Sequence, residues 1–298
     1  MLETASTFLE YRRKQEIELR DSNLSTGALP GLLTIEINIT ELCNRVCSFC
    51  PRSNPEVYPN SNLMISPVIV KKIASEIKRL RYVRKISFSG FGEPTLNRDF
   101  PSIVRAFRDV SEDLVLETNT NGDKLTSDYL DLLWEAGLNN LYWNLYDGPE
   151  QKDQILEIVK KSKFPINRVR LRPHWLGCDL EKEVGLILNN RSGAVAVNGS
   201  KVGISKKCNY PFYKMLIDWN GNVLCCSNDW LRKNIIGNVI STPLDEIWIS
   251  NKWHDFRLNI VNGDRALNEP CSTCDVDGEL FGSESVDEYF KFRSKGEV

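Results

Sequence analysis

Nine cysteines dominate the chemistry available to this sequence, and seven of them stand in tight groups. Three lie within eight residues, in the run Cys43-Asn-Arg-Val-Cys47-Ser-Phe-Cys50, close enough to surround one metal centre. Zinc would need a fourth ligand, and the only histidines are the distant His174 and His254. A [4Fe–4S] cluster can accept three cysteines and keep one reactive open iron. We therefore favour a cluster over zinc completed by a distant ligand, or over buried thiols grouped by chance.

A second set of cysteines lies in the last third of the chain. It offers five candidates for four ligand positions: Cys208, Cys225, Cys226, Cys271 and Cys274. The pair Cys271-x-x-Cys274 follows a hairpin signal, so a zinc ribbon is a serious alternative to an iron–sulfur site. The residues alone predict a second metal centre without fixing the metal. They also leave open whether Cys225 or Cys226 is a ligand.

Composition and charge place these cysteines in an ordinary globular protein. Of the 298 residues, 41% are hydrophobic and 26% charged, and 38 basic residues face 40 acidic ones, for a net charge of −2. That balance argues against a dedicated nucleic-acid-binding protein. Neither an apolar signal region nor a run of apolar residues long enough for a membrane span is present, so we expect a cytoplasmic protein. Because cysteines stay reduced in the cytoplasm, grouped cysteines indicate metal or redox chemistry.

Strand-like and helical stretches alternate from residue 32 onward, which predicts parallel strands joined by crossover helices. The expected strands cover residues 32–39, 82–89, 113–118, 140–146 and 168–172, with a weaker candidate at 194–197. The first expected helix begins at Ser66-Pro67. The other three cover about 100–110, 127–136 and 149–163. No strand ends in Gly-x-Gly-x-x-Gly, which disfavours a dinucleotide-binding sheet. We predict an α/β protein with a partial (β/α)6 TIM-like barrel, whose chemistry lies at the carboxyl ends of its strands.

The pattern divides the chain into three segments. Residues 1–31 are expected to form a helical extension, with a weak apolar stripe formed by Phe8, Leu9, Tyr11, Ile17 and Leu19. Residues 32–200 are expected to form the partial barrel. Residues 201–298 are expected to form a small hairpin-plus-helix domain held by metal, with the hairpin turn at Asn220-Gly221.

Three motifs at strand ends resemble a known family. The run Cys-x3-Cys-x-aromatic-Cys, with Phe49 at the aromatic position, resembles the signature of radical S-adenosylmethionine (SAM) enzymes. Gly90-Phe91-Gly92-Glu93-Pro94 is similar to the family's Gly-Gly-Glu-Pro motif, with Phe91 in place of the second glycine. Thr120-Asn121-Gly122 resembles the family's Thr-Asn-Gly. The resemblance covers roughly residues 32–175.

The resemblance also implies which residues surround the cofactors. Cys43, Cys47 and Cys50 would hold a [4Fe–4S] cluster, and SAM would chelate its open iron. The residues it places against SAM are Phe49, Gly90, Gly92, Glu93, Pro94, Asn119, Thr120, Asn121, Asn144 and Arg170, with Arg172 as the alternative partner for the SAM carboxylate. Structural roles fit some of these residues equally well. Asn121-Gly122 suits a turn, Asn144 can satisfy a backbone group, and either arginine can pair with a surface carboxylate.

The second cysteine set resembles the twitch domain, a shorter relative of the SPASM domain that follows many radical SAM barrels. The resemblance rests on the order Cys208, then Gly221 five positions before Cys226, then Cys271-x-x-Cys274. It implies one auxiliary [4Fe–4S] cluster held by Cys208, Cys226, Cys271 and Cys274, and so favours Cys226 over Cys225. Four thiolates leave no open iron, so this cluster would transfer electrons.

Two clusters together imply an oxidation. The family cleaves SAM to a 5′-deoxyadenosyl radical, which removes a hydrogen atom from an unactivated C–H bond. An auxiliary cluster that takes the remaining electron would turn an alcohol into a ketone. This resembles the aminocyclitol dehydrogenases of butirosin biosynthesis, so we expect a sugar or aminocyclitol substrate. The expected partners are that small molecule and a reductase such as flavodoxin or ferredoxin, with no nucleic acid and no membrane.

Candidate substrate residues lie near the expected strand ends. Tyr146, Arg172 and Trp175 are expected to contact the substrate, and His174 could act as general base, although a structural histidine is an equal alternative. Asn38 and Thr40 are further candidates.

Other reactions remain open. An epimerase would use a cysteine hydrogen donor, Cys178 or Cys225, although free cysteines usually only pack in a core. A peptide-modifying enzyme is disfavoured, since some thirty N-terminal residues are too few for a leader-binding domain. A non-catalytic iron–sulfur or zinc sensor would not need Gly92-Glu93-Pro94.

Overall fold

One mixed sheet organises the computed structural model, which describes residues 5–21, 28–174, 189–195 and 206–296. Its eight strands run in the order β5-β4-β3-β2-β1-β6-β7-β8. Their bounds are β1 Thr34–Ile37, β2 Lys85–Phe88, β3 Val115–Thr120, β4 Asn140–Leu145, β5 Val169–Pro173, β6 Lys214–Ile217, β7 Asn222–Leu224 and β8 Ile235–Asn238. Neighbouring strands from β5 through β6 are parallel, and β7 and β8 are antiparallel. The sheet is the partial barrel expected from the sequence.

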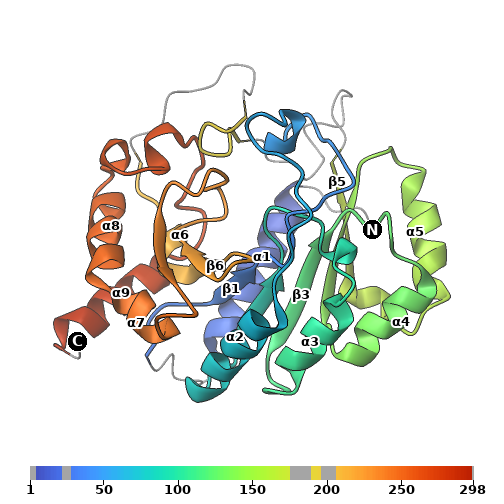
Figure 1. The fold of residues 1–298 in the computed structure, drawn as a ribbon, viewed down its shortest axis with the longest axis horizontal. Helices are drawn as coiled ribbons and strands as arrows, with labels where there is room; N and C mark the ends of the chain where they lie inside the picture. Colours follow the sequence, from blue (N-terminus) through green and yellow to red (C-terminus); the bar gives the residue numbers. More distant parts are fainter. Residues whose placement is uncertain (1–4, 22–27, 175–188, 196–205, 297–298) are drawn as a thin grey trace.

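Helices cover the sheet, and further helices lie beyond one end of it (Figure 1). The bounds are α1 Ala5–Asp21, α2 Pro67–Arg79, α3 Phe100–Arg108, α4 Ser127–Ala136, α5 Gln151–Lys160, α6 Tyr210–Tyr213, α7 Leu244–Ile249, α8 Asn251–Val261 and α9 Ser283–Ser294. Short 3-10 helices span Pro51–Ser53, Pro94–Leu96, Ile166–Arg168, Arg265–Leu267 and Cys271–Thr273. The four crossover helices expected from the sequence are α2 to α5. None of the helices in the described part of the chain is both long and apolar enough to cross a membrane.

Local signals in the sequence explain where the crossover helices start and stop. Ser66 caps α2 by accepting a hydrogen bond from the Ile69 N–H, and Pro67 occupies the first turn. The helix α4 ends at Gly137, whose φ of 102° suits a residue without a Cβ. These features confirm the predicted helix ends.

The two faces of the parallel strands have opposite character. Alternate residues such as Ile35, Ile86 and Phe88 are fully buried in the core beneath α2 and α3. The residues between them, such as Glu36 and Lys85, point to the inner side and line cavities there. Because side chains alternate across a strand, one sheet supplies both the apolar core and a polar interior.

The sixth parallel strand differs from the prediction. Ala194 and Val195 lie in a turn, and the rest of the weak candidate at 194–197 falls outside the described residues. The sixth strand is β6, which pairs with β1 from Thr34↔Lys214 onward and also forms the predicted hairpin with β7. Only this long-range pairing distinguishes a barrel strand from a simple hairpin strand. The pairing of β1 with β6 joins strands of the two expected segments 32–200 and 201–298 in one sheet, and the three-segment division stays a prediction.

The C-terminal helices pack around a buried arginine. The guanidinium of Arg257 lies 3.9 Å from the ring centroid of Trp248, 4.5 Å from that of Trp253 and 4.2 Å from that of Tyr289. It donates to the carbonyl oxygens of Pro211 and Trp248. Burial lowers the pKa of Arg257 to about 9. Cation–π contacts and two carbonyls stabilise the charge in place of a carboxylate.

Replacing this arginine should destabilise the fold. Arg257→Ala would leave a cavity between aromatic rings and two buried carbonyls without donors, so we expect the free energy of unfolding to fall by about 3 kcal/mol. Denaturant titration measures the change. The control is Lys291→Ala on the exposed face of α9, where a change within about 0.5 kcal/mol is expected. An equal, small effect of both variants would contradict the structural role of Arg257.

Candidate active site

A cavity of about 560 Å³ lies at the carboxyl ends of the parallel strands. It brings together most of the residues that the sequence singled out: Cys43, Cys47, Phe49, Cys50, Gly90, Gly92, Glu93, Asn119, Thr120, Asn121, Asn144, Tyr146, Arg172 and His174. Pro94 and Arg170 are not among the lining residues. Trp175 and Cys178 lie outside the described residues. The cavity has the position expected for the active site of a βα barrel.

The first cysteine group forms a loop directly after β1. Its three thiols are half-buried, free and all on the cavity wall. Asn60 holds the loop, because its Oδ1 accepts from the Cys43 N–H and its Nδ2 donates to the Cys43 carbonyl, both at 2.9 Å. Burial raises the pKa of Cys47 to about 11, so metal binding here would displace protons.

The types and positions of the donor atoms indicate which metal groups fit the two cysteine sets. Across the described ranges, no three Cys, His, Asp or Glu side chains gather closely enough to hold a single metal ion. Thiols supply all the donors, three on the cavity wall and four or five in the C-terminal part. That donor set suits iron–sulfur clusters.

Arg45 ties the cysteine loop to the ends of two strands. Its guanidinium donates to Asp123 after β3, at 2.7 Å, and to Asp147 after β4, at 2.6 Å. The same group lies 4.8 Å from the ring centroid of Tyr146. Bidentate contact with two carboxylates fixes the orientation of the loop better than a single charge could.

The departure from the Gly-Gly-Glu-Pro pattern has a structural reason. A Cβ at Gly92 would lie 2.1 Å from the Thr40 carbonyl oxygen, so glycine is required there. Phe91 has room instead, because its ring packs in a separate buried cluster. Its centroid lies 6.1 Å from that of Tyr58 and 4.9 Å from that of Trp230. A larger residue at position 91 therefore leaves the glycine backbone at the cavity unchanged.

Glu93 acts within the protein. Its carboxylate accepts hydrogen bonds from the Thr95 N–H and hydroxyl, the Thr120 hydroxyl and the Asn121 N–H. These bonds join the end of β2 to the end of β3. The structure thus assigns Glu93 a positioning role, and its direct contact with the SAM amino group stays a prediction.

Of the polar residues expected to contact SAM, Asn144 and Arg172 line the cavity, whereas Arg170 contacts the helix α1. Asn144 Nδ2 donates to Asn119 at 3.4 Å, while its buried Oδ1 has no hydrogen-bond partner among the described residues. That free acceptor favours a ligand beside it. Arg170 instead places its guanidinium 4.2 Å from the ring centroid of Tyr11 in α1. Of the two candidate arginines, Arg172 is the one on the cavity wall.

His174 belongs to an aromatic group at the cavity edge. Its ring lies 5.1 Å from that of Tyr146 and 6.1 Å from that of Phe49. Nδ1 lies 2.9 Å from the Arg172 carbonyl, which fixes the ring. Burial, followed by the charge of Arg172, lowers the pKa of His174 to about 3. A neutral imidazole of such low basicity is a better hydrogen-bond acceptor than general base.

Arg191 is a cavity residue that the sequence analysis missed. Its charge acts on Cys50 in the first cysteine group and lies within electrostatic range of Cys226 in the second. Its Nε is buried with no hydrogen-bond partner in the described part of the chain. Its φ of 48° is rare for a residue with a side chain. Unusual backbone conformations held by their surroundings often mark functional positions, but no sequence motif announces this one.

The second cysteine group assembles beside the cavity. The thiols of Cys208, Cys226, Cys271 and Cys274 lie within electrostatic range of one another, and Cys225 lies within range of Cys208, Cys226 and Cys271. Cys226 Sγ accepts hydrogen bonds from the backbone and side chain of Asn228. The neighbouring Cys225 is 1% exposed and packs in the main core. This environment favours Cys226 as the ligand, which stays a prediction.

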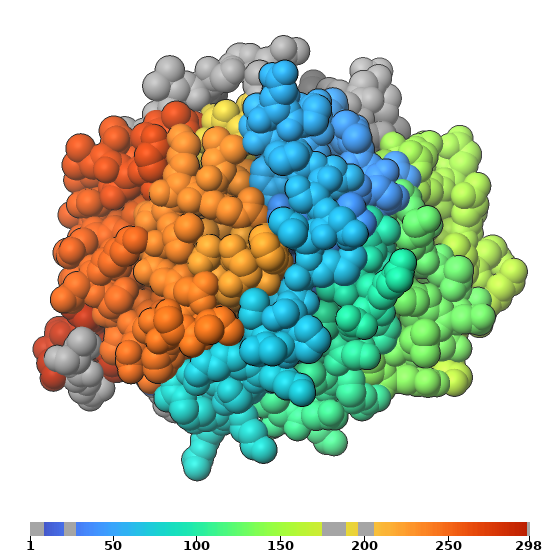
Figure 2. Space-filling view, in the orientation of Figure 1, coloured from blue at the N-terminus to red at the C-terminus, as the bar shows by residue number. Residues whose placement is uncertain are grey.

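A buried polar network joins the segment after β1 to the β6–β8 region. Asn38, after β1, donates to Glu41 and to Asp218 at 2.8 Å each. Its Oδ1 accepts from the backbone N–H groups of Phe91 and Gly92. Arg232 donates to both carboxylates. In Figure 2 the segment after β1 (blue) lies against the β6–β8 region (orange), and this network lies at that junction.

Loss of Arg45 should disturb the cysteine loop. Arg45→Ala would leave the loop without its link to β3 and β4, so we expect SAM cleavage to slow by about tenfold. Arg45→Lys should fall between, because an ammonium cannot hold both carboxylates bidentately. Lys124→Ala, on an exposed neighbour of Asp123, is the control. The readouts are iron content and 5′-deoxyadenosine released, and a wild-type rate for Arg45→Ala would contradict the role.

Single substitutions can show which of the two adjacent cysteines is the cluster ligand. After anaerobic reconstitution we expect about eight irons in the wild type and in Cys225→Ala, and about four in Cys226→Ala. Cys225→Ala should instead lower the free energy of unfolding, because it removes a buried core side chain. Iron and sulfide assays make the distinction. Loss of iron only in Cys225→Ala would overturn the choice.

Comparisons with known proteins agree with this geometry. Residues 37–170 match the radical SAM superfamily model, and residues 208–275 match an iron–sulfur cluster-binding (SPASM) domain. The S-adenosyl-L-methionine-dependent 2-deoxy-scyllo-inosamine dehydrogenase of Niallia circulans is 27% identical over 252 residues, covering 80% of this chain and 91% of that protein. A probable GTP 3',8-cyclase of Sulfurisphaera tokodaii is 29% identical, but the match covers only 50% of this chain and 47% of that protein.

Solved structures share the fold. BtrN in complex with AdoMet and 2-DOIA superimposes with a TM-score of 0.69 at 23% identity, covering 84% of this chain and 97% of that one. Native anSMEcpe with bound AdoMet gives 0.52 at 15% identity, covering 89% and 97%. The cysteine loop, the strand-end motifs and both domain matches lead to one conclusion: this chain carries a radical SAM domain over residues 37–170, followed by an iron–sulfur cluster-binding domain of the SPASM type over residues 208–275.

Proposed function

We propose that this enzyme oxidises a secondary alcohol of a small cyclic polyol, of the aminocyclitol or sugar class, to a ketone. One observation carries the proposal. The same cavity is lined by Cys43, Cys47 and Cys50 and by residues next to the second cysteine group, Ser227 and Asp275. A substrate held there would lie between a radical source and an electron acceptor. The similarity to a dehydrogenase that acts on 2-deoxy-scyllo-inosamine supports the substrate class.

The cofactor ligands follow from the two cysteine groups. Cys43, Cys47 and Cys50 would hold the SAM-binding [4Fe–4S] cluster, and the second cluster would take the set Cys208, Cys226, Cys271 and Cys274. When bound, these groups and SAM supply a 5′-deoxyadenosyl radical and an acceptor for one electron. The substrate carbon would lose a hydrogen atom to the radical. Its hydroxyl would lose a proton, and one electron would pass to the acceptor, which completes the ketone.

The side chains of the cavity suit such a substrate. Carboxylates of Glu36, Asp275 and Asp277 line it and can attract an ammonium or accept from hydroxyl groups. Arg191 adds a positive charge between the two cysteine groups. Such a charge stabilises an oxygen that becomes more negative as its proton leaves.

The alternatives differ in their cysteines and partners. An epimerase needs a thiol at the cavity, but Cys225 is buried in the core and is not among the lining residues. Cys178 falls outside the described residues and stays a candidate donor. The reductase, of the flavodoxin or ferredoxin type, is part of the proposal.

The test of the function is a turnover experiment with labelled substrate. Reconstituted enzyme receives SAM, dithionite and aminocyclitols deuterated at each carbinol carbon. We expect ketone and 5′-deoxyadenosine in a ratio near one, with deuterium in the 5′-deoxyadenosine. The Cys226→Ala variant should cleave SAM but form little ketone. An inverted alcohol in place of the ketone would contradict the proposal.

Arg191 supplies a more specific prediction. Removing its charge should slow ketone formation by about a hundredfold, as loss of a preorganised electrostatic group does. SAM cleavage should persist, because Arg191 is not part of the cysteine loop. The variants are Arg191→Ala and Arg191→Lys, with Arg168→Ala on the exposed Ile166–Arg168 turn as control. Equal rates of ketone formation in all of them would refute the role.

A further inference from the structure

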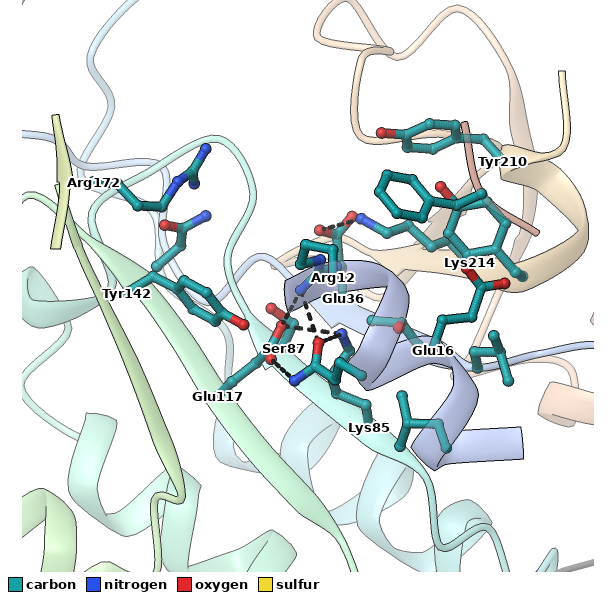
Figure 3. A pocket seen from close by; sticks show the side chains of 17 residues that line it. Arg12, Glu16, Glu36, Lys85, Ser87, Glu117, Tyr142, Arg172, Tyr210 and Lys214 are labelled. Carbon is teal, nitrogen blue, oxygen red and sulfur yellow. Dashed lines mark hydrogen bonds and ion pairs between the residues drawn. The ribbon is translucent and has the colours of Figure 1, made fainter. Parts of the chain in front are cut away.

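The helix α1 lies on the inner, polar side of the sheet, whereas α2 to α5 follow the outer side. Figure 1 shows it behind β1, and Figure 3 shows Arg12 pointing from the helix towards Glu117. The apolar stripe expected for this segment explains its docking only in part. Leu19 is buried against Leu33 and Tyr213, but Ile17 is 57% exposed and Gln15 is buried. The helix therefore docks through polar as well as apolar groups.

Four side chains, two from the helix and two from the strands, hold the middle of α1. Arg12 donates to Glu117 in β3 at 3.3 Å, and Gln15 Nε2 donates to the other oxygen of the same carboxylate at 3.2 Å. Lys85 in β2 donates to Gln15 Oε1 at 2.8 Å. Glu117 and Lys85 are both almost fully buried. Lys85 and Glu117 pair with each other at 3.4 Å, and α1 adds further hydrogen bonds to both buried charges. Because buried charges are stabilised by additional polar partners, these strand residues favour a docked helix.

The start of α1 reaches the active cavity. Leu9 lines it together with the three cysteines. Tyr11 contacts the inner side of β4 and β5, with its ring 6.3 Å from Tyr142 and beneath Arg170. A second cavity of about 180 Å³ lies between α1 and the strands, and Asn119 and Arg172 line both cavities. The helix thus forms part of the wall of both cavities.

The end of α1 is fixed to the C-terminal part of the chain. Arg20 donates to Ser285 at 2.6 Å in α9, and Glu16 accepts from the Gly282 N–H at 3.0 Å. Contacts at both ends and in the middle keep the helix across the opening of the barrel.

We propose that α1 is the closing wall of the active cavity, which limits substrate size and keeps SAM cleavage coupled to substrate oxidation. The inference rests on radical SAM chemistry and is independent of the substrate proposed above. Closure excludes water and prevents side reactions of a reactive intermediate. Without the wall, both cavities would lose the side that α1 supplies.

The test loosens α1 without touching the cofactor residues. Arg12→Ala/Gln15→Ala removes the contacts to Glu117, and Lys14→Ala on the exposed side of the same helix is the matched control. Arg12→Lys alone keeps the charge. Hydrogen exchange of the reconstituted holoenzyme measures docking and needs no substrate. We expect exchange in α1 about tenfold faster in the double variant than in the control.

Two activity readouts complete the test. With SAM and dithionite but no substrate, the double variant should release 5′-deoxyadenosine about threefold faster. With a turned-over aminocyclitol, the ratio of kcat/KM for a glycosylated analogue over the parent should rise by about tenfold. A melting temperature equal to that of the wild type shows that the variant folds. Faster exchange in α1 with unchanged abortive cleavage would overturn the proposal, and so would unchanged exchange. The first two readouts stand even if no aminocyclitol is a substrate.

Discussion

The constraint on which the rest of this structure depends is the burial of two carboxylates, Glu41 and Asp218, at the junction between the cysteine loop and the β6–β7 hairpin. Both need partners away from water, and Asn38 and Arg232 supply them. The same Asn38 holds the Gly90–Gly92 backbone through its oxygen. A single satisfied network therefore fixes the cysteine loop, the SAM motif and the auxiliary hairpin relative to one another.

Alternation along the parallel strands extends this arrangement to the whole barrel. Apolar residues on the outer side pack against the crossover helices, while charged and polar residues on the inner side surround the cavities. An interior of this kind can bind a polar cofactor and a polar substrate. Its deeper charges also need partners: Glu117 and Lys85 pair with each other, and α1 adds further hydrogen bonds to both.

Much of this organisation could be predicted from local sequence, because its signals are local. The cysteine spacing, the helix start at Ser66 and the end at Gly137 depend on a few neighbouring residues. The parallel pairing of β6 with β1 could not be predicted, since a hairpin strand and a barrel strand have the same pattern. Arg191 was missed because its position depends on packing between distant loops. The buried side of α1 was predicted only in part: Leu19 is buried as the weak stripe suggests, whereas the burial of Gln15 depends on polar contacts that leave no periodic signal.

The central claim is that the electron left on the substrate passes to the second cluster. Rapid freeze-quench EPR of a single turnover tests it most directly, with SAM and substrate mixed with enzyme in which only the first cluster is reduced. The account predicts one reduced auxiliary cluster for each ketone formed, and no such signal in Cys226→Ala. A ketone that appears while the auxiliary cluster stays oxidised would contradict it.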